Sequence, residues 1–498
     1  MKSLKIFWAL AIFAFVVLGA AAVWLGGLNQ DEGWYLYAAN MVAEGKTLYK
    51  DFFFTQGPTM PSFYRAFTWI WGAWGLLGAR IFTLVLGFVG ICLATGLARH
   101  LAPEGRKGTA ALVVFMLLGC NLYHLYYVAI PKTYALASVW VMAGFLLLTF
   151  GQRPYGLICA GLALAYAAGT RISLGALLCV VGLWLLLSKQ WKSLLWFCVG
   201  GFGGLALVYG PYLCDSGARA GLLAAQQYHA ARGGFDLVWA VGSVSRLVRW
   251  YLPVFIVLGL GVAGTLKVGG WRSKVGQWNL HVLLLSFFAV FAVQMLAPFP
   301  YEDYQVPVMG LLSVYAAVTF VKNTPAPSFN LQPSTFNLLL VLGLCFANSF
   351  GSPLLEKWMT NGQDRFWTLK KGSCEMAQLR DVARRIEAQD PGGKTLLTQD
   401  LYLAIETGRT VPKGLEMGPF AMLTDEGWKE LLTKTAPAEC RVAALSGYAF
   451  AIEPPVCTER SVEQQMEYWT LLKQNYELVD REEAFGQNAT TLLILKRK

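Results

Sequence analysis

The stretch "LGGLNQDEGWYLYAANMVAEG", residues 25–45, places two adjacent carboxylates, Asp31 and Glu32, directly after the first hydrophobic segment of the chain. Aromatic and apolar residues follow at helical spacing, and Gly45 stands where a helix would end. The pattern predicts a short helix with Asp31 as its N-cap, lying in the headgroup layer that aromatic side chains favour. A capping carboxylate can also react, so the stretch leaves a structural and a catalytic role open.

The composition around this stretch is that of an integral membrane protein. The 498 residues are 56% hydrophobic and only 14% charged, with a mean hydropathy of +0.46, whereas ordinary soluble domains are about 25% charged. The net charge of +11 comes largely from Lys and Arg in short loops between apolar runs. That placement follows the positive-inside rule, so we expect no nucleic-acid partner.

The hydrophobic runs predict about eleven membrane spans of the ~20 residues that a bilayer requires. They lie near residues 5–27, 76–98, 108–126, 133–150, 154–170, 172–188, 193–211, 251–268, 279–297, 305–322 and 335–350. The first is expected to be an uncleaved helix with a cytoplasmic N-terminus, because Lys2 and Lys5 precede it.

The charges between the spans support this map. Before residue 351, every acidic residue except Glu104 falls in a loop that the map places outside, and the loops placed inside are rich in Lys and Arg. An odd number of spans puts the remainder of the chain outside as well. We therefore expect a transmembrane domain over 1–350, with a long first outer loop over 28–64, and a periplasmic domain over 351–498.

The last 148 residues are charge-rich and predict a small α/β domain. "KTLLTQD" (394–400) is typical of a buried strand, "SVEQQMEYWTLLKQ" (461–474) of an amphipathic helix and "ATTLLILK" (489–496) of a closing strand. If this domain faces an oxidising compartment, Cys440 could pair with Cys457, and Cys214 with Cys374. The sequence has no motif typical of a zinc site.

The first outer loop carries a family resemblance. "DEGWYLYAANMVAEGKTLYKDFFFTQGP" (31–58), followed by "MPSFYRAFTWIWG" (60–72), resembles the GT-C glycosyltransferases, in the branch of protein O-mannosyltransferases, the lipid A aminoarabinose transferase and the lipopolysaccharide galacturonosyltransferases (glycosyltransferase families 39 and 83). Weaker similarity extends to "PKTYALASVWVMAGFLLL" (131–148), "GTRISLGALL" (169–178) and "YEDYQVPVMGLL" (301–312). The chain departs from the family in "TQGPTMP", which replaces paired prolines, and in Asp303, where a His or Arg often precedes the Tyr.

The resemblance implies a GT-C fold and a membrane glycosyltransferase that takes a sugar from a polyprenyl phosphate. It assigns the catalytic acid/base role to Asp31, with Glu32 as its partner. Within the similar segments we expect the substrate-binding residues Tyr35, Gln56, Tyr134, Glu302, Asp303 and Tyr304.

The chemistry of such a transfer is consistent with the charged residues. A sugar phosphate already carries a good leaving group, so the reaction needs mainly a carboxylate to take the acceptor's proton and cations to hold the departing phosphate. Asp31 would be the general base of an inverting displacement. Lys132 and Arg171 open apolar spans at their outer ends and are candidates for binding the donor phosphate, although long basic side chains at helix ends also snorkel without a ligand. No cofactor is required, but Glu302 and Asp303 could hold a divalent metal together with Asp31, or could form a solvated turn.

Two alternatives remain open. A lipid-linked-sugar flippase or transporter would place charges within the spans, and Arg80 is the ambiguous case. A polysaccharide polymerase or ligase would use a diphosphate-linked glycan. The acceptor could be a glycan, a lipid or a protein. We expect a multi-pass protein of the bacterial inner membrane with a periplasmic active site.

Overall fold

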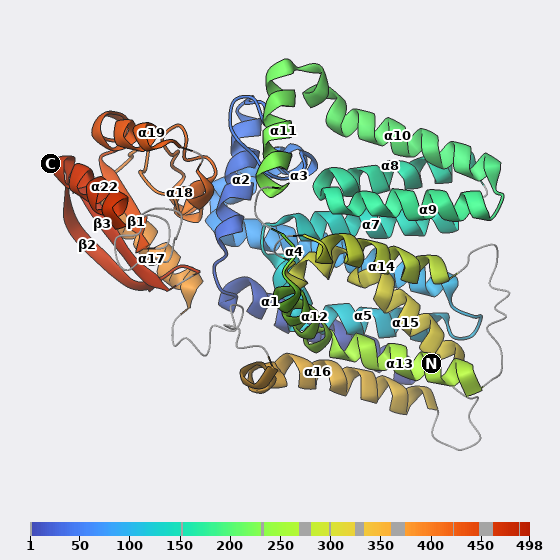
Figure 1. Cartoon of the computed structure of the whole chain (residues 1–498). Helices are drawn as coiled ribbons and strands as arrows, with labels where there is room; N and C mark the ends of the chain where they lie inside the picture. The colour runs from blue at the N-terminus through green and yellow to red at the C-terminus, as the bar shows by residue number, and fades with distance from the viewer. Residues whose placement is uncertain are drawn as a thin grey trace.

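In the computed structural model, every predicted apolar stretch is helical, and the helices pack side by side in one bundle (Figure 1). The structure describes residues 2–150, 153–230, 234–267, 280–297, 300–323, 333–359, 374–421, 423–447, 462–487 and 489–498. The helices of the bundle are α1 (Lys2–Leu25), α4 (Thr68–Leu101), α5 (Lys107–Gly119), α6 (Leu122–Ala129), α7 (Thr133–Thr149), α8 (Pro154–Thr170), α9 (Gly175–Leu187), α10 (Trp191–Cys214), α13 (Leu252–Lys267), α14 (His281–Met295), α15 (Met309–Asn323) and α16 (Pro333–Met359).

The lengths and apolar composition of these helices fit membrane spans. Among the described residues, four helical stretches are long and apolar enough for a span: Leu4–Leu25, Thr59–Leu101, Trp191–Cys214 and Glu302–Lys322. Two helix pairs, α5 with α6 and α12 (Leu237–Trp250) with α13, are bent by 70° and 79° and would raise the number to six. Five shorter apolar helices coincide with the other predicted spans. The prediction of a polytopic helical membrane protein is therefore confirmed.

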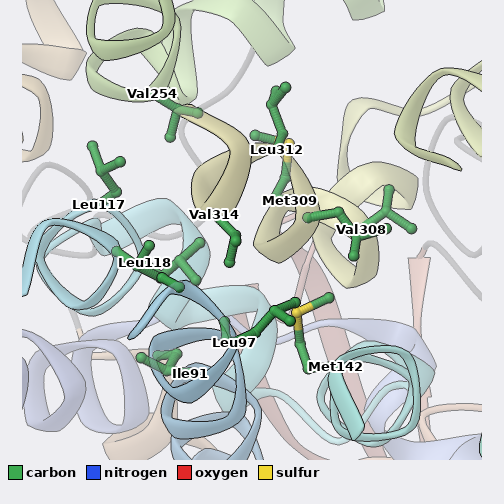
Figure 2. Close-up of a cluster of buried hydrophobic side chains, with 14 of the residues drawn as sticks. Ile91, Leu97, Leu117, Leu118, Met142, Val254, Val308, Met309, Leu312 and Val314 are labelled. Atoms are coloured by element: carbon green, nitrogen blue, oxygen red, sulfur yellow. The ribbon is translucent and has the colours of Figure 1, made fainter. Parts of the chain in front are cut away.

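The core of the bundle forms around α15, which is almost entirely buried. Figure 2 shows Met309, Leu312 and Val314 of α15 among apolar side chains of the surrounding helices. These neighbours are Ile91 and Leu97 of α4, Leu117 and Leu118 of α5, Met142 of α7 and Val254 of α13. By contrast, large apolar side chains on α1 and α10, such as Phe13 and Phe202, stay exposed, as expected for helices that face lipid.

The first outer loop contains α2 (Gln30–Ala43) and α3 (Thr59–Tyr64). Gly45 has φ +89° just after α2, so the predicted helix end is confirmed. The predicted N-cap is wrong, because Asn29 occupies that position and its side chain accepts a hydrogen bond from the backbone N–H of Asp31 at 3.1 Å. The side chain of Glu32 accepts from the N–H of Asn29 at 2.9 Å, which completes a capping box. The N-cap role of Asn29 leaves the Asp31 carboxylate free of capping.

A buried ion pair holds α2 on the bundle. The guanidinium of Arg80, in α4, donates to both carboxylate oxygens of Glu32, at 2.6 and 2.7 Å, and neither side chain is exposed. Its other N–H groups donate to the backbone oxygens of Val23, Gly26 and Gly27 at 2.8–3.0 Å. Arg80 thereby satisfies carbonyl groups at the end of α1 and joins α1, α2 and α4 at one point.

The end of the chain forms a mixed α/β unit beside α2, drawn in orange and red in Figure 1. Its elements are α17 (Glu375–Gln389), α18 (Leu401–Thr407), α19 (Asp425–Glu430), α20 (Ala436–Glu439), β1 (Val442–Ser446), α22 (Val462–Asn475), β2 (Tyr476–Phe485) and β3 (Thr490–Arg497). The three strands are antiparallel in the order β1-β3-β2, with Ile494 opposite Ala444 on one side and Asp480 on the other.

The sequence predicted this unit in part. The helix and the closing strand are confirmed as α22 and β3. The segment 394–400 is buried at Leu396 and Leu397 but forms only isolated bridges, to Thr410 and Ala443, and α18 begins directly after it at residue 401. The predicted strand there is therefore wrong. The boundary near residue 350 stays a prediction, and α16 runs past it to Met359.

One cysteine prediction can be compared with the structure. Cys214 and Cys374 are free thiols, and Cys374 Sγ lies 3.3 Å from the backbone oxygen of Trp24, so the predicted pair is wrong. The thiol of Cys440 is buried, and Cys457 lies outside the described residues.

Arg80 is expected to be essential for stability. Arg80→Met leaves the carboxylate of Glu32 buried and unpaired, which should lower the free energy of unfolding by about 3–5 kcal/mol. Denaturant titration of the purified protein in detergent measures the loss, with the exposed Arg65→Met as the matched control, expected within about 0.5 kcal/mol of wild type. Adding Glu32→Gln to Arg80→Met should restore part of the loss. Equal stabilities of Arg80→Met and Arg65→Met would contradict the role of the ion pair.

Candidate active site

Asp31 lies in the first turn of α2, beside a lysine from another element. Its Oδ2 is 2.8 Å from Nζ of Lys132, and its Oδ1 accepts a hydrogen bond from the indole N–H of Trp34 at 3.1 Å. The side chain of Asp31 keeps 29% exposure, whereas that of Lys132 keeps only 8%. Asp31 is thus a fixed carboxylate whose side chain stays partly exposed.

Lys132 stands at the N-cap of α7, between two carboxylates. Besides Asp31, its Nζ lies 3.5 Å from Oδ2 of Asp303, which is in the 3-10 helix Glu302–Val308. The hydroxyl of Tyr134 donates to the same oxygen of Asp303 at 2.7 Å. Three segments far apart in the sequence therefore meet at one ammonium group.

A second cation completes the cluster. Arg171 follows α8, and its guanidinium lies over the rings of Tyr134 and Tyr304, 4.9 and 4.6 Å from their centroids. Its Nη1 donates to the hydroxyl of Thr133 at 3.1 Å. Its Nε is buried and has no hydrogen-bond partner among the described residues. Arg171 is thus positioned by aromatic rings and one hydroxyl, with donor capacity left over.

The charges set the ionisation of the groups around Asp31. Burial acts to raise the pKa of Asp31, but the Lys132 ammonium and the Trp34 N–H outweigh it, and the pKa lies below its usual value of 3.8. Burial, and next the Asp31 carboxylate, raise the pKa of Tyr35 above its ordinary range. At neutral pH Asp31 is therefore ionised and the Tyr35 hydroxyl is neutral.

The structure brings most of the predicted site residues together and separates two of them. Tyr35 stacks on Trp34 at 3.9 Å between ring centroids. Glu302 instead pairs with Arg246 of α12 at 2.9 Å. Glu32 faces Arg80 and is fully buried, so its position argues against a partnership with Asp31 in catalysis.

Gln56 lies in a loop that packs beside the segment that carries Arg171. Its carbonyl oxygen accepts from the hydroxyl of Tyr49 at 2.6 Å. The next residue, Gly57, packs so closely on Gly169 that a Cβ would lie 2.0 Å from the Gly169 oxygen. Only glycine allows this approach, which fixes the loop beside the segment that carries Arg171.

Sequence reasoning missed Trp34, Thr133 and Arg246. Trp34 could have been found, because it follows Asp31 by three residues on the predicted helix and so shares its face. Thr133 gave no signal, and Arg246 gave only that of a basic residue in an outer loop, since their partners come from other elements. Among the residues that the structure describes, no three His, Cys, Asp or Glu side chains gather as ligands for a metal ion.

Comparisons with known proteins bear on the fold. No protein-family model matches the chain, and no curated protein matches it either. Among solved structures, the chain is similar to ArnT from Cupriavidus metallidurans bound to undecaprenyl phosphate, with a TM-score of 0.59 and 13% identity over 98% of this chain and 97% of that one. The Archaeoglobus fulgidus oligosaccharyltransferase in the apo form matches at 11% identity and a TM-score of 0.48, over 87% of this chain and 69% of that one.

The chain thus has the fold of the GT-C glycosyltransferases, which confirms the fold that the first outer loop predicts. It is a multi-pass membrane protein with a small C-terminal α/β unit. At 13% identity the likeness to ArnT shows the fold alone.

The ion pair of Asp31 predicts a pH dependence of stability. Because the folded pKa of Asp31 lies below 3.8, its charged form stabilises the fold fully above that pH, and this contribution is lost as the pH falls through the lowered pKa. Wild type should therefore be more stable than Asp31→Asn by roughly 1 kcal/mol between pH 5 and 8, since solvent partly screens the pair. Denaturant titration at several pH values should show the difference shrinking below about pH 4. A difference that grows on acidification would contradict the assignment.

Proposed function

We propose that this protein is a membrane glycosyltransferase that moves a sugar from a polyprenyl phosphate to an acceptor hydroxyl, with Asp31 as the general base. The observation that carries the proposal is one buried cluster in which a partly accessible, ionised carboxylate lies beside two cations, Lys132 and Arg171. A base and an anion-binding pair are the two functions that the transfer requires.

The reaction is an inverting displacement. The acceptor oxygen attacks the anomeric carbon of the sugar while its proton passes to Asp31. The bond between the anomeric carbon and the phosphate oxygen breaks, and its electron pair leaves with polyprenyl phosphate. Lys132 holds the phosphate as it departs, together with the Nε of Arg171, which has no hydrogen-bond partner among the described residues.

The resting ion pair fits this sequence of events. As long as Lys132 faces only carboxylates, it keeps the pKa of Asp31 low and the carboxylate a weak base. A donor phosphate that also binds Lys132 reduces the electrostatic effect of the ammonium on Asp31. The pKa of Asp31 then rises toward its ordinary value. Donor binding therefore makes Asp31 a stronger base at the moment it is needed.

The fold and its position support the lipid-linked donor. The similar ArnT structure is bound to undecaprenyl phosphate, and the cluster here lies at the ends of α7 and α8, where a membrane lipid's phosphate would reach. We propose a bacterial inner membrane, with the cluster and the C-terminal unit on the periplasmic side. The contact between α18 and α2 supports placing that unit on the acceptor side of the site.

Arg80 bears on the transporter alternative. An unpaired charge within a span would favour a transport pathway. All N–H groups of Arg80 instead donate to Glu32 and to backbone oxygens at the end of α1. The charge of Arg80 therefore stabilises the fold and is not available to a transported substrate.

Loss of the base should slow transfer strongly. Asp31→Asn keeps the shape and the hydrogen bond from Trp34 but cannot take a proton, so the transfer rate should fall by about 100-fold or more. The assay offers purified protein a panel of polyprenyl-phosphate sugars with envelope extract and measures the release of polyprenyl phosphate. Glu302→Gln, which changes a carboxylate outside the Lys132 cluster, is the matched control and should lose much less. Unchanged transfer by a folded Asp31→Asn would overturn the proposal, and so would movement of the donor across liposomes without transfer.

Loss of Arg171 should weaken donor binding more than the chemical step. Arg171→Ala removes an anchor for the phosphate, and we expect KM for the donor to rise by about tenfold or more, since hydrogen bonds from charged groups contribute about 1.5–3 kcal/mol. The exposed Arg65→Ala is the control. Steady-state kinetics at varied donor concentration separate KM from kcat, and an unchanged KM would refute the phosphate-binding role.

A further inference from the structure

The Lys132 ammonium occupies the position where a divalent cation would bridge two aspartates. Asp31 and Asp303 come from segments 272 residues apart, yet each presents its Oδ2 to the same nitrogen, at 2.8 and 3.5 Å. Carboxylates that converge in this way from separate loops are the usual ligands of Mg²⁺ or Ca²⁺. Here the cation that both carboxylates contact is the ammonium of Lys132, a group of the chain itself.

The charges of the cluster leave no need for a metal ion. Two carboxylates, Asp31 and Asp303, are balanced by two cations, Lys132 and Arg171, in a mostly buried cluster. Adding a divalent cation would leave two uncompensated positive charges, which is costly for groups largely removed from water.

The carboxylate oxygens are also occupied by donors. Trp34 donates to Oδ1 of Asp31, and Tyr134 donates to the Oδ2 of Asp303 that faces Lys132. A metal ion would have to compete with these hydrogen bonds as well as with the ammonium. An ammonium has three N–H donors, so after Asp31 and Asp303 one remains for a phosphate oxygen.

We infer that Lys132 is a built-in replacement for a divalent cation: it bridges Asp31 and Asp303, presents its remaining N–H to the donor phosphate, and makes the site independent of metal ions. The contact between Lys132 and the phosphate rests on the proposed function. The bridge from Lys132 to Asp31 and Asp303 is present in the resting protein and can be tested by itself.

The consequence is that removing the ammonium creates a metal site. Lys132→Met leaves two carboxylates facing each other across the vacated space, and a hard cation would relieve their repulsion. Tb³⁺ is a suitable probe, because Trp34 touches Asp31 and can sensitise its luminescence. We expect Lys132→Met to bind Tb³⁺ at least tenfold more tightly than wild type, with Mg²⁺ or Ca²⁺ competing.

Two variants control for other binding sites. Lys132→Met with Asp303→Asn removes one of the two carboxylates and should lose the gain in Tb³⁺ affinity. Lys50→Met breaks a comparable ion pair, since Lys50 lies 2.8 Å from Asp215, and Asp215 is its one ion-pair partner among the described residues. It should bind Tb³⁺ like wild type and leave transfer unchanged.

The wild-type protein gives an independent test that does not depend on how a variant folds. Its melting temperature should be unaffected by Mg²⁺, Ca²⁺ or EDTA, and its transfer rate should change by less than twofold on treatment with EDTA. The inference is overturned if Lys132→Met gains no Tb³⁺ affinity, or if Mg²⁺ stabilises the wild type through Asp303. The Tb³⁺ result stands whether or not the transfer assay detects a donor, so failure of this inference and failure of the proposed function are distinguishable.

Discussion

The buried ion pair between Glu32 and Arg80 is the interaction on which the rest of the structure depends. It joins the end of α1, the start of α2 and the middle of α4 with hydrogen bonds from every N–H of one guanidinium. A charge buried this deeply costs several kcal/mol unless it is paired and fully hydrogen-bonded, and here both conditions hold. The pair fixes the first turn of α2, and with it the direction of the neighbouring Asp31 side chain.

The adjacent carboxylates therefore have opposite environments. Glu32 is fully buried, and its partners are the guanidinium of Arg80 and the backbone N–H of Asn29. Asp31, one residue away, points to the other side of the helix, where Lys132 and Trp34 contact it and part of it stays exposed. Successive residues of a helix are turned by about 100°, so one position suits a structural ion pair and the next suits chemistry.

The C-terminal unit helps to hold the same helix from the other end of the sequence. Asp400 accepts hydrogen bonds from the side chains of Gln30 and Tyr402, at 2.6 and 2.9 Å, and Gly33 packs directly on the backbone at Tyr402. The backbone N–H of Val411 donates to the hydroxyl of Tyr37. Apolar side chains of α2 and of the C-terminal unit belong to one buried cluster.

The sequence by itself determined the membrane class, the positions of the apolar helices, the end of α2 at Gly45 and the candidates Asp31, Lys132 and Arg171. These features are local: hydrophobic run length, helical period, a residue tolerant of positive φ, and charges at the ends of spans. Only the tertiary structure decided that Asn29 rather than Asp31 caps α2, that Glu32 belongs to Arg80, and that Glu302 pairs with Arg246 while Asp303 joins Lys132. Each of these outcomes distinguishes neighbouring side chains of similar chemistry. For Glu32, Glu302 and Asp303 the deciding partner belongs to an element distant in the sequence, and its position is set by packing, which no period in the sequence reveals.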